Sequence, residues 1–311
     1  MKNVTLRQLR IFNEVARQLS FSQAAAAMHL TPPAISMQIR ELEEQIGLPL
    51  FERGGRKVQL TGTGEYVLVY VRRILAALKE ADDAVARLCQ LEAGQLVIGM
   101  VSTAQYFLPM MLAQFRLQHP GVDIRLAVGN RAKLVEWLQA GEVDVAVMGR
   151  PPKELATHAE TFASQPHVFV APINHPLVAL ARKKGALDAA QLSNQPFIMR
   201  ETGSGTRAAL ERFCADNGLA LQVTMEMASN ETIKQAVMAD MGLSFLSLHT
   251  IGMELRHHML ALLPVQGSPV MRDWHCVHMQ DRVLSPAAEA FHQFVLARGD
   301  AFLKQAFGKL S

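Results

Sequence analysis

The sequence has 311 residues, of which 50% are hydrophobic and 19% are charged, a composition typical of a globular chain long enough for two or three domains. No apolar run approaches the ~20 residues that cross a bilayer, and the first residues lack the apolar core of a signal peptide, so we expect a cytoplasmic protein with no membrane partner. Three scattered cysteines, Cys89, Cys214 and Cys276, form no disulfide framework.

The net charge of +3 is concentrated near the N-terminus. Residues 1–60 contain eight Lys and Arg against five Asp and Glu, which leaves 23 of each sign in the rest of the chain. Because phosphate contacts require Lys and Arg, this asymmetry favours an N-terminal module that binds nucleic acid.

Three helices are predicted in the first fifty residues. Apolar residues at helical spacing over residues 6–19 indicate a first amphipathic helix. Ser22 is a candidate N-cap for an alanine-rich second helix. Thr31 is placed to cap a third helix with Pro32 at its first position, and Gly47 ends it. Two short helices joined by a tight turn are typical of a helix-turn-helix, whose second helix enters the major groove of DNA.

A short β-hairpin is predicted next, because Gly54 and Gly55 lie between two short extended runs. Its tip carries Arg53, Arg56 and Lys57, which can lie along a phosphate backbone or in a minor groove. Helix order, caps and basic hairpin agree with one another. They favour a winged helix-turn-helix over a small helical bundle with a solvated basic hairpin.

Five segments of this region carry a family signature: FSQAA (21–25), LTPPAIS (30–36), IRELEEQIG (39–47), LFER (50–53) and LTGTG (60–64). They resemble the corresponding segments of the LysR-type transcriptional regulators. Pro32 stands where that family usually has a glutamine, and Met37 where many members have an arginine. Together, the residues and the resemblance predict a DNA-facing surface formed by Ser22, Thr31, Pro32, Pro33, Ser36, Met37, Arg40, Arg53, Arg56 and Lys57.

A long connecting helix is predicted next, because no proline or glycine occurs between Gly64 and Gly94. Its apolar residues recur at alternating steps of four and three: Val67, Val71, Ile74, Leu78, Ala81, Val85 and Leu88. This seven-residue spacing favours a coiled coil over a helix packed on its own domain. A homodimer would place two recognition helices on a pseudo-palindromic promoter site. The LysR-type resemblance implies such dimers, which commonly pair into homotetramers.

From Gln95 onward, short apolar runs alternate with helical stretches, which is the pattern of α/β folds. Strands are predicted at 96–101, 123–128, 143–148, 167–171, 197–200, 223–228 and 243–248, with helices at 107–118, 133–140, 205–217 and 231–241. Two such lobes in series predict a ligand cleft, since these sheets bind ligands at the carboxyl ends of strands. The LysR-type resemblance implies the same two-lobed architecture, like that of periplasmic binding proteins.

The predicted organisation is an all-α winged helix-turn-helix at residues 1–61, a linker and dimerisation helix at 62–93, and a two-lobed α/β effector domain. The chain is expected to cross between lobes near 163–166 and to return near 267–269. Lobe 1 would then comprise 94–163 and 268–311, and lobe 2 would comprise 164–267.

Three strand ends supply candidate effector-binding residues. Hydroxyls at Ser102 and Thr103 follow the first strand, and a guanidinium follows the third in the segment Met148, Gly149 and Arg150. The most informative segment precedes a helix, where glycines, hydroxyls and the helix N-terminus can cradle a phosphate or carboxylate. Its candidates are Thr202, Gly203, Ser204, Gly205, Thr206 and Arg207. This loop lacks the Gly-Lys-Ser/Thr ending of a P-loop, which argues against ATP chemistry.

The segments GNR (129–131), VMGRPP (147–152) and RETGSGTR (200–207) narrow the resemblance. They look like those of the CbbR-type LysR regulators, which control RuBisCO and Calvin-cycle operons. Met37 fits this subgroup, whereas Thr202 stands where proline is expected. The similarity adds Gly129 and Asn130 to the effector site. It implies a small anionic effector such as ribulose bisphosphate, phosphoenolpyruvate or NADPH, with RNA polymerase as a further partner.

Three alternatives stay open. An enzyme is disfavoured, because His275 and His278 would point to opposite faces of one strand and leave too few ligands for a metal. A transport-type binding protein would explain the two lobes but not the helix-turn-helix. Within the LysR-type class, the effector could instead be an aromatic or amino acid.

Overall fold

The computed structural model describes residues 4–52, 58–88 and 94–308. The chain forms two compact units, one of residues 1–85 with 140–142 and one of residues 86–139 with 143–311. The first contains α1 (Leu6–Gln18), α2 (Phe21–Ala27), α3 (Pro32–Ile46) and most of α4 (Gly62–Leu88).

Helices α1 to α3 pack around one small core. Ile11, Phe12, Ile35 and Leu42 are fully buried there. Phe51 lies against this core, with its ring centroid 5.5 Å from that of Phe12. A single bridge pairs Phe51 with Leu60, on either side of residues 53–57. The helices are therefore held by apolar burial, and the base of the predicted hairpin is anchored to them.

The second unit is built on one mixed sheet. Within the described residues the strand order is β2-β1-β3-β9-β4-β7-β5-β6, with β8 paired to β4. The strands are β1 (Gly94–Val101), β2 (Val122–Gly129), β3 (Val145–Met148), β4 (Thr157–Pro172), β5 (Pro196–Arg200), β6 (Gln222–Met227), β7 (Leu243–Ser247), β8 (Leu260–Leu263) and β9 (Val270–Met279). Each end of the sheet is parallel, and the two ends are joined by the antiparallel pair β4–β9.

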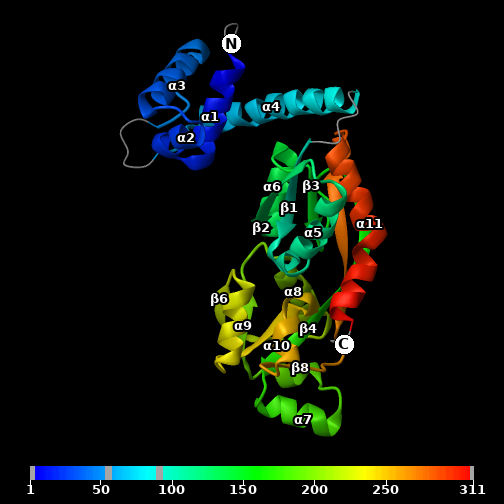
Figure 1. Cartoon of the computed structure of the whole chain (residues 1–311). Helices are drawn as coiled ribbons and strands as arrows, with labels where there is room; N and C mark the ends of the chain where they lie inside the picture. The colour runs from blue at the N-terminus through cyan, green and yellow to red at the C-terminus, as the bar shows by residue number, and fades with distance from the viewer. Residues whose placement is uncertain (1–3, 53–57, 89–93, 309–311) are drawn as a thin grey trace. The chain divides into compact units, whose positions relative to one another are not determined.

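Helices cover both ends of this sheet (Figure 1). Those of the first lobe are η1 (Ser102–Tyr106), α5 (Leu108–Gln118), α6 (Arg131–Ala140) and α11 (Pro286–Phe307). Those of the second lobe are α7 (Pro176–Lys184), η2 (Ala189–Leu192), α8 (Gly205–Asp216), α9 (Asn230–Met238), η3 (Leu248–Thr250) and α10 (Gly252–Arg256). Separate apolar clusters fill the two lobes, one around Trp274 and Phe291 and another around Phe169 and Phe197. The predicted fold class, a helix-turn-helix followed by a two-lobed α/β domain, is confirmed.

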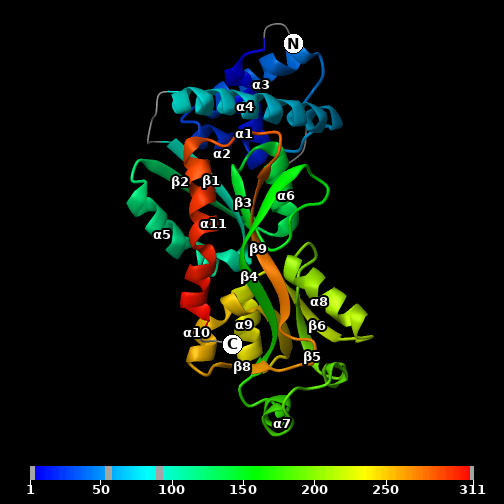
Figure 2. The ribbon, with the colours of Figure 1, turned by 90° about the vertical axis from the view of Figure 1, so that its right-hand side faces the viewer.

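Strands β4 and β9 run side by side from one lobe to the other (Figure 2). In this crossing ribbon, Gln165 pairs with Arg272 and Pro166 pairs with Met271. The 16-residue β4 begins at Thr157, ten residues before the strand predicted at 167–171. That prediction missed the first part because it is polar and largely exposed, without an apolar run. The partners of Ala163 to Pro166 on β9 are Trp274 to Met271, next to the predicted return at 267–269, and the lobe boundaries stay a prediction.

Candidate functional site

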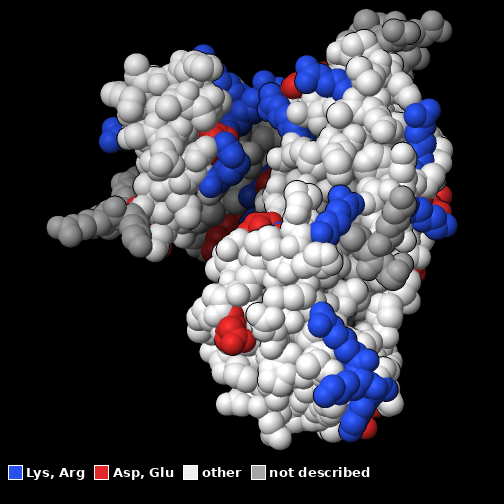
Figure 3. Space-filling model, turned by 60° about the horizontal axis from the view of Figure 1, so that its bottom comes forward, with Lys and Arg blue, Asp and Glu red and all other residues white. Residues whose placement is uncertain are grey.

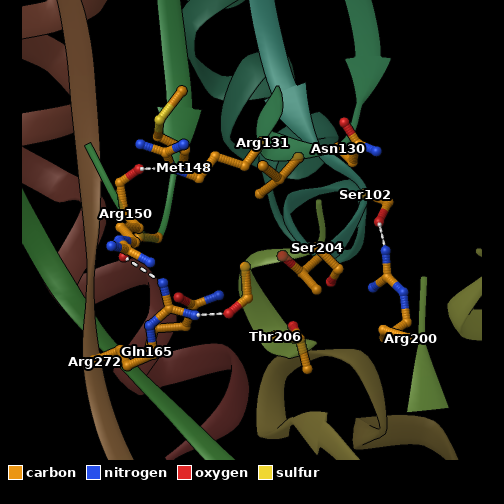
Figure 4. Close-up of a pocket in the computed structure, with 14 residues that line it drawn as sticks. Ser102, Asn130, Arg131, Met148, Arg150, Gln165, Arg200, Ser204, Thr206 and Arg272 are labelled. Carbon is orange, nitrogen blue, oxygen red and sulfur yellow. Dashed lines mark hydrogen bonds between the residues drawn. The ribbon is translucent and has the colours of Figure 1, made fainter. Parts of the chain in front are cut away.

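A cavity of about 370 Å³ lies where strands β1, β2, β3 and β5 end. Both lobes and the crossing ribbon contribute to it, and the labelled side chains surround an open space in Figure 4. This is the position at which α/β sheets bind ligands.

Nine of the thirteen predicted effector residues line this cavity: Ser102, Thr103, Asn130, Met148, Gly149, Arg150, Ser204, Gly205 and Thr206. Three others lie beside it. Gly129 lies against Trp137 instead, where an added Cβ would come within 3.0 Å of the indole. Thr202 and Gly203 are exposed in the turn before α8, and Gly203 has the left-handed φ of +86° that glycine accepts most readily.

Arg207 is the fourth predicted residue outside the lining. It was expected to supply a positive charge that binds the anionic effector. Its guanidinium is instead held by Glu211, one turn further along α8, with 2.8 Å between Nε and Oε1, and by Glu226 of β6. The third helical residue of α8 therefore points along the helix surface toward two carboxylates. The prediction that Arg207 contacts the effector is not supported by this arrangement.

Five lining residues were not predicted: Val101, Arg131, Gln165, Arg200 and Arg272. Gln165 and Arg272 lie on the crossing ribbon, far from any strand end, so a search of strand ends could not find them. Arg131 and Arg200 stand inside the quoted segments 129–131 and 200–207. The positive charge of these two arginines was the sequence feature that could have identified them as effector-site residues.

Two of the four cavity arginines are neutralised by carboxylates. Arg200 donates to both oxygens of Glu201, at 2.7 and 3.0 Å, and to Oδ1 of Asn230 at 2.6 Å. Arg131 donates to both oxygens of Glu154, at 3.0 and 3.2 Å, and this bond lowers the pKa of Glu154 to about 2. These two guanidiniums have little charge left for a ligand.

Arg150 and Arg272 have no such counterion. Arg272 donates to the carbonyl oxygens of Gly205 at 2.7 Å and Gly149 at 3.0 Å, which are neutral and belong to opposite lobes. The Arg150 guanidinium forms no hydrogen bond or ion pair with any residue that the structure describes. Burial, then the charges of Arg150 and Arg131, lower the pKa of Arg272 to about 10. Arg272 stays protonated at neutral pH, but its cation is under-compensated, and an anion would relieve this.

Gln165 presents an unpaired polar atom at the same place. Its side chain is only 2% exposed, and Oε1 has no hydrogen-bond partner among the described residues. A Cβ on Gly149 would collide with this oxygen, so the Gln165 side chain would have to move to admit a larger residue there. A buried amide oxygen without a donor costs free energy, and a ligand hydroxyl or a bound water could supply the donor.

Beneath Gln165, the ring of His167 is fully buried. Its Nδ1 lies 3.2 Å from the Gln165 carbonyl oxygen and its Nε2 lies 3.3 Å from the Thr206 hydroxyl. Burial, followed by the charge of Arg272, lowers the pKa of His167 to about 3. The imidazole is therefore neutral and fixes the first turn of α8 against the ribbon.

Neutral donors complete the cavity. The Ser204 side chain makes no capping bond to α8, so its hydroxyl is available beside the positive end of the helix dipole. Ser102 Oγ accepts from Arg200 at 3.2 Å and from Asn230 Nδ2 at 3.3 Å, which directs its own proton elsewhere. Two uncompensated guanidiniums, hydroxyls and a helix N-terminus can together bind a small dianion.

The exposed face of α3 carries the predicted DNA contacts of the first unit. Thr31, Pro32, Pro33, Ser36, Met37 and Arg40 are all exposed, whereas Ile35 and Ile39 face the core. The helix therefore presents one continuous outer face, as a recognition helix requires. Whether these residues contact DNA stays a prediction.

Two predicted caps need correction. Ser20, not Ser22, caps α2 and accepts from the Gln23 amide at 3.3 Å, which leaves Ser22 exposed inside the helix. Thr31 is the N-cap residue of α3, but its hydroxyl makes no capping bond. Pro32 and Pro33 occupy the first helical positions and have no N–H to donate. The Thr31 hydroxyl is therefore not engaged in capping.

Arg53, Arg56 and Lys57, predicted on the hairpin tip, lie outside the described residues. On the face shown in Figure 3, Lys and Arg side chains form separate groups rather than one continuous basic surface.

The linker helix α4 differs from its predicted seam. Val71 is fully buried and Val67 packs beside it, both against the core of the first unit. The exposed apolar side chains lie on a stripe that includes Tyr66, Tyr70 and Ile74. Ile74 belongs to the predicted seam, as does Val85, which is also exposed. The first turns of α4 therefore pack on the helix's own domain, the alternative to a coiled coil. A helix that leaves a small domain first covers that domain's core.

The segment around His275 and Cys276, considered above as a metal site, is not one in the part of the chain that this structure describes. His275 and Cys276 lie on β9, where Cys276 is fully buried and burial raises the pKa of its thiol to about 12. Among residues 4–52, 58–88 and 94–308, no group of three or more His, Cys, Asp or Glu side chains could hold a metal ion. No helix in the described parts of the chain is long and apolar enough to span a membrane.

Comparison with known families assigns both units. Residues 6–65 match the bacterial regulatory helix-turn-helix protein, lysR family, and residues 90–300 match the LysR substrate binding domain. The chain belongs to the LysR family. It is a DNA-binding transcriptional regulator of that family, as its sequence predicted.

Three similar LysR-type proteins give more detail. The chain is 44% identical to the HTH-type transcriptional regulator CfxR of Cupriavidus necator, covering 100% of this chain and 96% of that protein. It is 47% identical to the HTH-type transcriptional regulator CbbR of Rhodospirillum rubrum, covering 94% and 96%. The regulatory domain of Synechocystis PCC6803 CcmR, solved in complex with 2-PG, matches with a TM-score of 0.63 and 32% identity, covering 66% of this chain and 96% of that domain. The predicted resemblance to CbbR-type regulators is confirmed.

Proposed function

We propose that this LysR-type regulator controls a carbon-fixation operon and that a small phosphorylated acid in the inter-lobe cavity controls its promoter binding. One observation carries the effector class: Arg150 and Arg272 face the cavity without a counterion. Two such charges match a phosphate dianion better than a neutral or singly charged molecule. The similarity to the regulators CbbR and CfxR supports the proposal that the target is a carbon-fixation operon.

The effector is a molecule of the size of 2-PG (2-phosphoglycolate), which the related CcmR domain binds. Phosphoenolpyruvate, a phosphorylated acid like 2-PG, is the next candidate, and ribulose bisphosphate is larger. NADPH is several times larger than 2-PG and fits least well. Asn130, Ser204 and Thr206 would hold the phosphate and carboxylate oxygens beside the two guanidiniums.

Effector binding would act through the crossing ribbon. Arg272 bonds a carbonyl of each lobe, so a ligand that draws this guanidinium into the cavity changes how the lobes are held together. Such a ligand shifts DNA binding only if it binds one arrangement of the lobes better than another. We propose activation as the output, as in the related activator CmpR of Synechocystis.

Assembly completes the proposal. The exposed stripe of α4 around Tyr66 and Tyr70 would pair with a second copy, giving a homodimer whose two α3 helices read one promoter site. Pairs of dimers would form the homotetramer. We further propose a cytoplasmic regulator that contacts RNA polymerase and has no enzymatic activity.

A salt-controlled DNA-binding titration tests this function. The full chain is titrated onto the promoter region beside its own gene, with and without 2-PG, phosphoenolpyruvate, ribulose bisphosphate and NADPH. We expect specific binding whose affinity or footprint changes with 2-PG or phosphoenolpyruvate. Specific binding that responds only to an aromatic or amino acid would replace the effector class, and no specific binding at any salt would overturn the regulator itself.

A further inference from the structure

A second, larger cavity lies on the opposite face of the crossing ribbon. Alternate residues of a strand point to opposite faces. Gln165 and its partner Arg272 line the effector cavity, whereas the neighbouring pair, Pro166 and Met271, lines the second cavity. This apolar cavity has about 1130 Å³ of open volume and touches both lobes and the C-terminal part of α11.

The lining is almost entirely apolar. Val168, Leu262 and Leu263 come from the second lobe, and Leu303 and Phe307 come from α11. The one ion pair at its edge, Asp300 with Lys304 at 2.7 Å, joins two exposed side chains whose charges cancel. Nothing in this lining favours an anion, in contrast to the effector cavity.

One buried polar group faces the apolar cavity. His249 of η3 is 5% exposed, and its Nδ1 accepts a hydrogen bond from Trp274 Nε1 at 3.1 Å. Burial also lowers the pKa of His249 to about 4, so the ring is neutral. Because Nδ1 is the acceptor, Nε2 carries the proton. No hydrogen bond from Nε2 to a described residue is present, so this donor is left for an occupant of the cavity.

We propose that the apolar cavity is a second ligand site, which takes a neutral apolar molecule with one acceptor oxygen. The apolar body would pack on Leu262, Leu303 and Phe307, and the oxygen would accept the Nε2 proton of His249. A carboxylate is disfavoured, because no uncompensated cation lines the cavity and burying a bare charge is costly. This site is separate from the proposed effector site. Since both cavities share the β4–β9 ribbon, a ligand in the apolar cavity would be a second molecule to which the regulator responds.

The test uses a fluorescent probe of this chemistry with the full-length protein. Prodan, 6-propionyl-2-(dimethylamino)naphthalene, is neutral and apolar, carries one ketone oxygen, and shifts its emission to shorter wavelength when it is desolvated. We expect saturable binding to the wild-type chain. The analogue 2-(dimethylamino)naphthalene lacks the ketone and should bind about five-fold more weakly, the loss of one hydrogen bond.

Two matched methionines locate the site. Met271 lies in the apolar cavity and is 60% exposed, whereas Met253 lies on α10 away from it and is 61% exposed. Both tolerate a polar side chain without loss of core packing. Met271→Glu should weaken prodan binding ten-fold or more, and Met253→Glu should change it less than two-fold.

Two kinds of result would overturn the proposal. Absence of saturable binding, or an equal loss in the two variants, would remove the site. Equal affinity for prodan and its ketone-free analogue would remove the role of His249. None of these results depends on whether 2-PG is the effector of the other cavity.

Discussion

The two faces of the β4–β9 ribbon carry opposite chemistry, although neighbouring residues build them. On one face Gln165 and Arg272 line a cavity with uncompensated positive charge, and on the other Pro166 and Met271 line an apolar one. Each face also holds a buried neutral imidazole, His167 on the first and His249 on the second. A single strand pair between two lobes therefore presents two chemically distinct cavities, because side chains alternate along a strand.

The largest expected effect tests the two imidazoles. Burial lowers the pKa of His167 to about 3 and that of His249 to about 4, below the unfolded value near 6.5. Between these values the unfolded chain binds protons that the folded chain does not, so stability is full above pH 6.5 and falls as the pH decreases. We expect each histidine to reduce the free energy of unfolding by about 2 kcal/mol between pH 7 and pH 5.

Denaturant unfolding followed by tryptophan fluorescence measures this loss, because Trp137 and Trp274 both lie in the second unit. His167→Asn should remove the contribution of His167, about 2 kcal/mol between pH 7 and pH 5, and leave that of His249. An unchanged slope in that variant would show that His167 does not stay neutral in the folded state.

The next largest effect is expected on 2-PG affinity, and it distinguishes an arginine that lines the effector cavity from one that lies outside it. Arg272→Met removes a cation without a counterion and should weaken 2-PG binding 100-fold or more, equivalent to about 2.7 kcal/mol. Arg207→Ala is the matched control, because its guanidinium is held by Glu211 and Glu226 and does not line the cavity. Isothermal titration should give the control an affinity within two-fold of wild type. A loss of similar size in both variants would contradict the assignment.

A smaller effect is expected at Gln165, whose Oε1 is buried without a partner. Gln165→Leu removes this unpaired oxygen, so the variant should be as stable as the wild type or about 1 kcal/mol more stable. 2-PG offers only acceptor oxygens at neutral pH, so the same change should leave 2-PG affinity within about two-fold of wild type. Thermal unfolding and calorimetry on one sample distinguish this from a structural role, in which stability and affinity would fall together.

The two cavities are also expected to be weakly coupled in their ligand affinities. If the ribbon couples the two cavities, saturating 2-PG should change prodan affinity two- to five-fold, and saturating prodan should change 2-PG affinity by the same factor. Paired titrations with the wild-type chain measure both factors. Two unchanged affinities would show that the faces act independently, and unequal factors would show that the probes do not bind at two linked sites.

Much of this arrangement was predictable from the sequence. Apolar runs located the strands that end at Val101, Met148 and Arg200, and the segments that follow them predicted eight of the cavity residues. The ninth, Asn130, came from the resemblance to CbbR-type regulators. Local patterns sufficed because each of these residues follows a strand or begins a helix. The same patterns predicted the exposed outer face of α3.

The rest depends on contacts between distant residues. Gln165 and Arg272 are 107 positions apart and meet only through the register of β4 and β9. Glu226, which withdraws Arg207 from the cavity, lies on another strand and leaves no local trace. The predicted seam of α4 was wrong at Val67 and Val71, because heptad spacing is the same whether a helix packs on its own domain or on a second copy. The apolar cavity was not predicted at all, since its lining is shared among β4, β8, β9 and α11.

A footprint on the promoter beside the regulator's own gene tests the central claim most directly. Wild-type protein and Arg272→Met are compared on the same DNA, each with and without 2-PG. We predict equal footprints without 2-PG, since the substitution lies in the second unit, and a change with 2-PG in the wild type alone. A variant that responds to 2-PG as the wild type does would contradict the claim that this cavity reads a phosphorylated effector for the DNA-binding helices.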